Sequence, residues 1–180
     1  MPEKPDEAKP RNQNHRYTLR RSWIGEGGIV NFIMLNPSTA DDVFDDATIR
    51  RCIGFAKRWG FSGISVTNLF AYRATDPSDL VALLNTSGGW HMAVGEDNAA
   101  HIDREAKAAK LIVCAWGDNC DRMPEYASHR DLDVIQMLRR YGDLFCIRHT
   151  AKGNPAHPVR ERYTDKPMLF YPQLLENDNA

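Results

Sequence analysis

The 180-residue sequence lacks the features that would mark a membrane or secreted protein. No apolar run approaches the roughly 20 residues that a membrane-spanning helix needs, and the first residues contain no apolar core of a signal peptide. We therefore expect a cytoplasmic protein with no membrane partner. Residues 1–14 hold almost nothing apolar to bury, so we expect a disordered tail there, followed by a single α/β domain over residues 15–175.

Paired metal ligands and two common catalytic motifs are also missing. The four cysteines occur at no CxxC spacing, and three of them (Cys52, Cys114 and Cys146) lie within apolar patterns typical of buried, reduced thiols. A zinc site is therefore disfavoured, and we expect neither a metal nor a cofactor. The sequence contains no GxxxxGK[ST] phosphate-binding loop and no GxSxG nucleophile turn.

An excess of charge of one sign is missing as well, because the net charge is −1. Composition thus predicts no broad electrostatic attraction to nucleic acid. Between Arg139 and Lys166, however, seven Lys or Arg residues stand against three acidic ones. This stretch could contact phosphates, or it could equally be an ordinary solvated surface.

What is present is a regular alternation of strand and helix patterns. Nearly continuous apolar runs predict four strands, at 29–35, 64–70, 111–117 and 143–149. Helical spacing of apolar residues predicts helices at 48–59, 78–84, 98–109 and 131–141. The alternation predicts a three-layer α/β/α fold around a mainly parallel, four-stranded central sheet.

Three further segments are assigned by their turn residues. The turn at Gly25–Gly28 predicts that residues 16–23 pair with the first apolar strand as an N-terminal hairpin. Residues 85–95 and 118–130 are expected to be loops, and the residues after 149 to be a Pro-rich tail.

Polar side chains gather just after the predicted strands. Parallel strands joined by right-handed crossovers end at one edge of a sheet, and ligands of open α/β sheets bind beyond that edge. The set comprises amides, carboxylates, imidazoles, a hydroxyl pair, an arginine and an aromatic ring: Asn36, Ser38, Thr39, Asp41, Asp42, Asp45, Asp46, Asn68, Tyr72, Arg73, His149, Asn154 and His157. It predicts a site for a polar, planar and partly anionic ligand.

Several of these residues also have a purely structural interpretation. Asp45 or Asp46 could cap the helix that follows, and Asn36, which precedes a proline, could simply turn the chain. His149 could cap its strand, and Trp116 fits the core better than a stacking surface. Asn68 is harder to explain structurally, because a buried amide needs hydrogen-bond partners.

Four segments taken together resemble the uracil-DNA glycosylase superfamily: L-N-P after the first strand, V-T-N-L-F, A-W-G, and a fourth strand ending in R-H. The order and approximate spacing agree over roughly residues 29–158. More closely, MLNPSTAD, NLFAYRATDP, AWG and GNPAHP resemble a bacterial and phage family described as a domain of unknown function. The superfamily resemblance implies a uracil-DNA glycosylase-like fold, although Met34-Leu35 replaces the glycine expected before the N-P pair.

The resemblance implies roles residue by residue. Asn36 would position the attacking water, Asn68 would bind the Watson–Crick edge of a flipped base, and His149 or His157 would stabilise the departing base anion. A carboxylate would stabilise the oxocarbenium-like sugar, the candidates being Asp41, Asp42, Asp45 and Asp46. Other expected contacts to the base or nucleoside are Pro37, Ser38, Thr39, Phe70, Tyr72, Arg73 and Asn154, with Phe70 or Tyr72 as the stacking ring. Expected contacts to DNA phosphates are Arg148, Lys152 and Arg160.

The hypothesis from sequence is a metal-independent DNA glycosylase that excises a damaged or modified base. A phage-modified base, with a role in antiviral defence or in repair, follows from analogy alone. The alternatives are a nucleotide or nucleoside hydrolase or transferase, and a non-catalytic module that binds nucleic acid on the same scaffold. We expect DNA as the partner and a monomeric protein.

Overall fold

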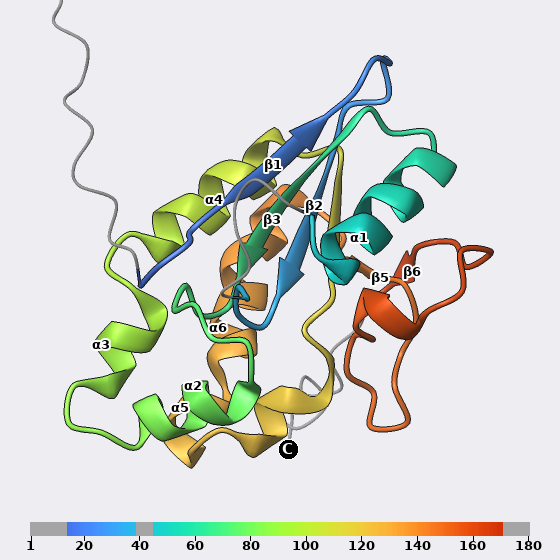
Figure 1. Ribbon diagram of the computed structural model, residues 1–180. Helices are drawn as coiled ribbons and strands as arrows, with labels where there is room; N and C mark the ends of the chain where they lie inside the picture. The colour runs from blue at the N-terminus through green and yellow to red at the C-terminus, as the bar shows by residue number, and fades with distance from the viewer. Residues whose placement is uncertain (1–13, 39–44, 171–180) are drawn as a thin grey trace, which may run out of the picture.

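A six-stranded sheet runs through the centre of the protein (Figure 1). The computed structural model describes residues 14–38 and 45–170, so nearly all of the predicted N-terminal tail lies outside the described residues. The strands occur in the order β1-β3-β2-β4-β5-β6. Their bounds are β1 Leu19–Ser22, β2 Ile29–Met34, β3 Gly63–Asn68, β4 Leu111–Cys114, β5 Phe145–Cys146 and β6 Met168–Leu169.

The four central strands, β3, β2, β4 and β5, are parallel, as the alternating sequence pattern predicts. They are the four strands expected from the apolar runs. The prediction of a four-stranded sheet is nevertheless wrong, because β1 and β6 add one antiparallel strand at each edge. Both edge strands are short, and β6 lies inside the segment that the sequence suggested was only a Pro-rich tail.

The predicted N-terminal hairpin is also wrong. β1 pairs with β3, with Leu19 opposite Val66, rather than with β2. The reason is that β3 and β4 occupy both edges of β2, whereas β3 has a free edge. The Gly25–Gly28 turn instead carries the chain closely past the end of α1, where a Cβ on Gly27 would lie 1.9 Å from the carbonyl oxygen of Gly60.

Helices cover both faces of the sheet, and the alternation of side chains along β2 decides which face each helix takes. Val30, Phe32 and Met34 pack in one core with α1 (Ala47–Arg58). Ile33 and Leu35 point to the opposite core, which contains α4 (Asn98–Ala108) and α6 (Arg130–Leu138). In Figure 1, α1 lies in front of the sheet and α4 and α6 lie behind it.

Local signals explain where the main helices begin. The side chain of Asp46 accepts a hydrogen bond from the backbone N–H of Ile49 at 2.8 Å, which confirms the predicted cap of α1. Asp76 caps α2 (Pro77–Leu84) in the same way, through the N–H of Ser78 at 2.8 Å. Asp97 precedes α4, but its side chain makes no capping hydrogen bond.

The segments predicted as loops contain short helices. α3 (Gly89–Val94) lies within 85–95, α5 (Glu125–Ser128) lies within 118–130, and η1 (Gly117–Arg122) begins one residue before that second segment. Two more single-turn 3₁₀ helices are η2 (Arg139–Tyr141) and η3 (Pro158–Arg160). These elements are too short for helical spacing of apolar residues to mark them. All four cysteines are buried and unpaired, and no helix in the described ranges has the length and apolarity needed to cross a bilayer.

The order of the parallel strands places a crevice between β2 and β4. The chain leaves β2 toward α1 on one face of the sheet, and it leaves β4 toward α6 on the other. Neighbouring strands whose connections go to opposite faces leave space at their carboxyl ends, which is where open α/β sheets bind ligands.

Candidate functional site

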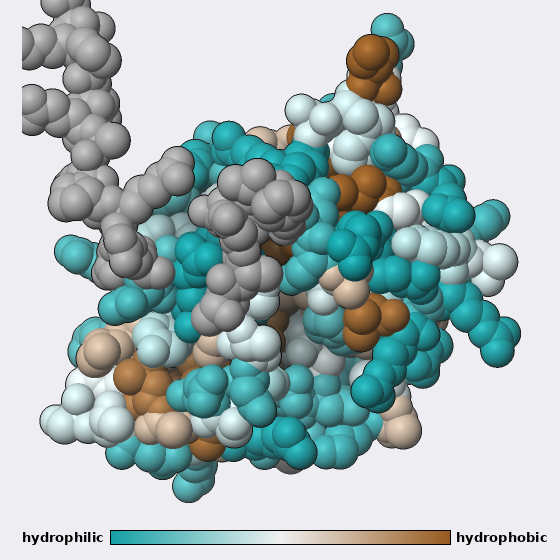
Figure 2. Space-filling view, in the orientation of Figure 1, coloured by the Kyte–Doolittle hydropathy of each residue, from teal (hydrophilic) through white to brown (hydrophobic). Residues whose placement is uncertain are grey.

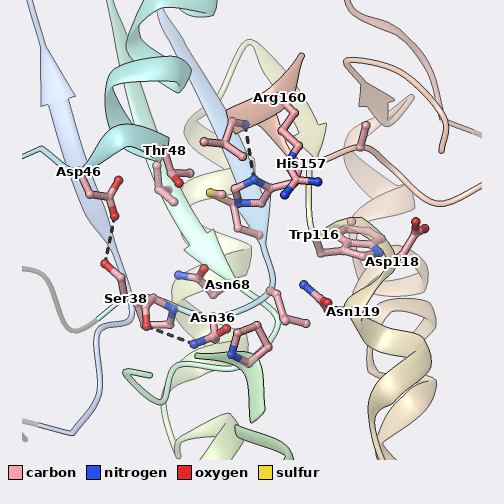
Figure 3. A pocket seen from close by; sticks show the side chains of 18 of the residues that line it. Asn36, Ser38, Asp46, Thr48, Asn68, Trp116, Asp118, Asn119, His157 and Arg160 are labelled. Atoms are coloured by element: carbon pink, nitrogen blue, oxygen red, sulfur yellow. Dashed lines mark hydrogen bonds between the residues drawn. The ribbon is translucent and has the colours of Figure 1, made fainter. Parts of the chain in front are cut away.

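A cavity of about 1010 Å³ lies at this crevice. The surface is hollowed near the centre of Figure 2, and Figure 3 shows the side chains from close by. Polar lining residues come from the segment before β1, the ends of β2 and β3 and the loops after them, the start of α1, the segment after β4, and the segment from β5 to η3. They are Arg16, Asn36, Ser38, Asp46, Thr48, Asn68, Thr75, Asp118, Asn119, Arg148, Thr150, His157, Arg160 and Glu161. The polar chemistry that follows the strands in sequence therefore does converge in space.

Asn36 is held by its amide nitrogen. The Nδ2 atom donates to the carbonyl oxygens of Ala74 at 2.8 Å and Pro37 at 3.2 Å. Because two carbonyls fix the NH₂ group, the orientation of the amide is determined and Oδ1 is left to accept a hydrogen bond (Figure 3). Asn36 therefore turns the chain and also presents an acceptor to the cavity.

Asn68 ends β3 and is only 4% exposed. Its backbone carbonyl accepts a hydrogen bond from Nδ2 of Asn98 at 3.1 Å. Its side-chain amide lies in the cavity (Figure 3) and makes no hydrogen bond to any residue that the structure describes. The donor and the acceptor of this amide are both unused and can be reached from the cavity, so they are available to a ligand or to water.

Asp46 serves two purposes at once. Its Oδ1 caps α1 through Ile49, and its Oδ2 accepts a hydrogen bond from the hydroxyl of Ser38 at 3.0 Å. The carboxylate thereby ties the residues after β2 to the N-terminus of α1, whose first turn, with its positive helix-dipole end, borders the cavity. Asp45 forms an ion pair with Arg21 at 2.9 Å and does not line the cavity.

His157 lines the cavity and is neutral near pH 7. Burial lowers the pKa of its imidazole, Asp46 acts in the opposite direction, and Arg160 lowers the pKa further. Its Nδ1 accepts a hydrogen bond from the backbone N–H of Val159 at 3.4 Å. The proton of the neutral ring is therefore on Nε2, which makes His157 a hydrogen-bond donor through that atom.

His149, the other candidate imidazole, does not line the cavity. Its two ring nitrogens face the carbonyl oxygens of Gly153 at 3.2 Å and Leu169 at 3.3 Å, and the ring packs on Phe170. These contacts attach the loop after β5 to β6. Between the two histidines that the sequence left open, the structure brings His157, and not His149, to the other site residues.

The proposed stacking rings also lie elsewhere. Phe70 is 0% exposed in the core, edge-on to Trp90, and the ring of Tyr72 packs against His15. Neither these two residues nor Arg73 lines the cavity. Val66 and Asn68 are the residues of β3 that line the cavity, and the aromatic residues that follow the strand pack elsewhere.

Only some of the predicted site residues after β5 line the cavity. Arg148 and Arg160 line the cavity, whereas Lys152 and Asn154 do not. Lys152 pairs with Asp121 at 2.7 Å, and Nδ2 of Asn154 donates to Asp118 at 2.9 Å. Pro37 and Ser38 line the cavity as expected, while Thr39, Asp41 and Asp42 lie outside the described residues.

The segment after β4 contributes residues that were not among the predicted site residues. Trp116, Gly117, Asp118 and Asn119 line the cavity. Hydrogen bonds from Thr150, and then from Asn154, lower the pKa of Asp118, so this carboxylate is charged near pH 7. Trp116 is 1% exposed, in agreement with the expected core position. The sequence signal that could have identified these residues is the position of W-G-D-N directly after an apolar strand.

The electrostatics of the cavity are mixed. Arg148 is neutralised by a two-point ion pair with Glu161, at 2.8 and 3.0 Å. Within residues 14–38 and 45–170, Arg160 has no carboxylate partner, and no cluster of three or more His, Cys, Asp or Glu could hold a metal ion. The cavity thus offers amides, a neutral imidazole, carboxylates and one free guanidinium.

Fold and site together define an α/β protein with a polar cavity at the carboxyl edge of a parallel sheet. Residues 16–159 match the family described as "Protein of unknown function (DUF1643)", and the chain belongs to that family. Neither a curated protein nor a solved structure matches the chain significantly. The family match agrees with the closer of the two sequence resemblances.

Proposed function

We propose that the cavity receives a nucleobase flipped out of DNA and that the protein cleaves the base from its sugar by hydrolysis of the N-glycosidic bond. The proposal includes a uracil-DNA glycosylase-like arrangement of the central parallel strands. The base is a damaged or modified one. Analogy alone suggests that the modification comes from a phage and that the protein acts in defence.

The observation that carries the proposal is the unused amide of Asn68. An amide presents one acceptor and one pair of donors in a plane, which complements the adjacent donor and acceptor on the edge of a nucleobase. The cavity, at about 1010 Å³, is large enough for a nucleoside. A base that pairs with Asn68 would use the donor and the acceptor that this 4% exposed side chain directs into the cavity.

The other lining residues fit the steps of hydrolysis. Oδ1 of Asn36 would accept a hydrogen bond from the attacking water, and the carboxylate of Asp46 would stabilise the positive charge that develops on the sugar. The bond between C1′ and the base nitrogen breaks, and its electron pair leaves with the base. The water oxygen then bonds to C1′, and its proton passes to the departing base or to solvent.

His157 would stabilise the base as it leaves. A neutral imidazole whose Nε2 carries the proton can donate to an oxygen or nitrogen of the base as that atom becomes negative. Its lowered pKa supports this role, because the donor remains in one protonation state near pH 7.

The test is a base-release assay with the full chain. Duplex and single-stranded oligonucleotides that contain damaged or phage-modified bases are incubated with protein, with EDTA to inhibit contaminating nucleases, and abasic sites are revealed by alkaline cleavage. Asn68→Ala and His157→Ala are expected to lower the rate by about a hundredfold or more. The matched controls are Asn154→Ala and His149→Ala, since both side chains lie outside the cavity, and they should retain activity.

The outcomes separate the proposal from its alternatives. Abasic sites from the parent protein that disappear in the two cavity variants alone support a glycosylase. If the protein cleaves free nucleotides or nucleosides and releases no base from DNA, it is a nucleotide or nucleoside hydrolase or transferase and not a glycosylase. If the protein binds DNA through Asn68 but releases no base from any substrate, it is a non-catalytic module that binds nucleic acid.

A further inference from the structure

The charged residues of α1 are all basic. Ala47–Arg58 contains Arg50, Arg51, Lys57 and Arg58 and no acidic residue. None of the four forms an ion pair within residues 14–38 and 45–170. Elsewhere, by contrast, carboxylates pair with Arg20, Arg21, Arg104, Arg140, Arg148 and Lys152.

The segment around η3 continues this surface toward the cavity. It packs on α1, where Nε of Arg51 donates to the carbonyl oxygen of Pro158 at 3.3 Å. Arg160 and Arg162 are exposed and have no carboxylate partner among the described residues. The nearby acids are already engaged, Glu161 by Arg148 and Asp165 by the backbone N–H of Arg162. Hydrophilic residues gather over α1 on the right of Figure 2.

Two of the guanidinium groups are held in place by one tyrosine ring. The guanidinium carbon of Arg51 lies 3.7 Å from the ring centroid of Tyr163, and that of Arg58 lies 4.0 Å from it. Both guanidinium groups therefore lie against this one ring. Gly54 makes room for the ring, since a Cβ there would lie 2.5 Å from Cε1 of Tyr163.

Stacking of this kind restricts the side chains and leaves edge N–H groups of each guanidinium able to donate. Planar guanidinium groups bind phosphate oxygens through two N–H donors, and restriction before binding lowers the entropy lost on binding. Five unpaired guanidinium groups beside a cavity are therefore arranged for a chain of phosphates, and a single phosphate would engage only part of them.

We propose that Arg50, Arg51, Arg58, Arg160 and Arg162 form a phosphate-binding track along which a DNA strand lies as it enters the cavity. This inference rests on the proposed function, because it supplies the backbone contacts of the strand whose base enters the cavity. α1 starts at the cavity and has 12 residues, so it extends about 18 Å from it. At the 3.4 Å spacing along one strand of B-DNA, the track matches roughly five nucleotides on one side of the flipped nucleotide.

The test compares two triple variants that remove the same charge. Arg50→Gln, Arg58→Gln and Arg162→Gln together remove three of the five positive charges of the track, and Lys107→Gln, Lys110→Gln and Arg139→Gln together remove three exposed positive charges outside it. Affinity of the full chain for a fluorescent oligonucleotide is measured by anisotropy over a range of salt concentrations. Loss of three phosphate contacts should lower the slope of log affinity against log salt by about 2 for a single strand and about 3 for a duplex. The matched control should keep the parent slope.

A second variant tests the role of the tyrosine ring. Tyr163→Leu keeps apolar packing against Phe55 but removes the stacking surface, so affinity should fall although no charge is lost. Unchanged affinity in this variant would overturn the role of Tyr163, and equal loss in both triple variants would overturn the track. Association with vesicles that contain phosphatidylserine, but with neither form of DNA, would also overturn it.

These results are distinguishable from failure of the proposed function. A salt slope that depends on the track, in a protein that releases no base, supports the track and contradicts the glycosylase. Base release that is insensitive to the track triple variant at every salt concentration supports the glycosylase and contradicts the track.

Discussion

Ser38 donates a hydrogen bond to the carboxylate of Asp46 across eight positions of the sequence, and so joins the end of β2 to the start of α1. The same carboxylate caps the helix. A structural and a chemical role therefore meet in one side chain, and substitution by alanine would remove both.

Asp46→Asn separates the two roles. Asparagine is as good a helix cap as aspartate, so the free energy of unfolding in urea should change by less than about 0.5 kcal/mol, whereas Asp46→Ala should lose about 1 kcal/mol. Both variants lose the charge that would stabilise the sugar, and both should release base much more slowly than the parent. Normal activity in a stable Asp46→Asn protein would show that the carboxylate charge is not used.

His157 should make the protein less stable in mild acid. Burial depresses its folded-state pKa below the ordinary value of 6.5, so between these two values the unfolded chain binds more protons than the folded one. The stabilisation from a neutral His157 is complete above pH 6.5 and is lost as the pH falls toward the folded-state pKa. Urea unfolding of the parent and His157→Gln should show a smaller pH dependence in the variant. An unchanged pH dependence in His157→Gln would contradict the assignment.

Arg20 should matter more to stability than its exposure suggests. The side chain is 61% exposed, but it forms a two-point ion pair with Glu105, which is only 2% exposed. Arg20→Met leaves a buried carboxylate with only Arg104 nearby, which should cost about 2–3 kcal/mol in urea unfolding. Arg104→Met should cost less than about 1 kcal/mol. The reverse order would mean that Arg104 is the principal partner of Glu105.

Asn98 should support the site from behind. Its Nδ2 donates to the carbonyl oxygens of Asn68 at 3.1 Å and Leu69 at 2.9 Å, just where β3 ends. Asn98→Ala removes the side-chain donor of both carbonyls, and Arg130 still donates to that of Leu69 at 3.1 Å. We expect a loss of about 1–3 kcal/mol, together with weaker binding of the base through a displaced Asn68. Asn85→Ala, which removes an exposed amide bonded only to Val81, is the comparison. Unchanged activity in a destabilised Asn98→Ala would assign it to stability alone.

The central part of the fold was predictable because its signals are local and repeated. β-branched and apolar runs mark the parallel strands, and Asp46 and Asp76 mark the starts of helices through hydrogen bonds within three residues. The partner of β1 was not predictable in this way. Its choice of β3 depends on which strand edge remains free once the parallel strands have paired, which no local pattern records.

The site was predictable to the extent that strand ends meet at one edge. Asn36 and Asn68 follow directly from that rule, because each lies within two residues of the end of a parallel strand. Beyond the first residues of a loop the rule carries no information. His149 points toward β6. Eight residues later, His157 lies at the cavity, because the backbone N–H of Ala156 donates to the carbonyl of Arg148 and the backbone N–H of Gly117 donates to the carbonyl of Pro155. Phe70 likewise shows that a ring beside the site can belong wholly to the core.

Segments that line the cavity are as distant in sequence as Met34 and Glu161. The unfolded chain cannot bring them together, so a compound that fills the cavity binds the native state alone. At a concentration one hundred times its dissociation constant, such a compound adds about 2.7 kcal/mol to the free energy of unfolding, or roughly 5–10 °C to the melting temperature of a chain of this length. The heat resistance of the protein is therefore itself a reporter of what the cavity accepts, and nucleosides can be compared by melting temperature before any reaction is known.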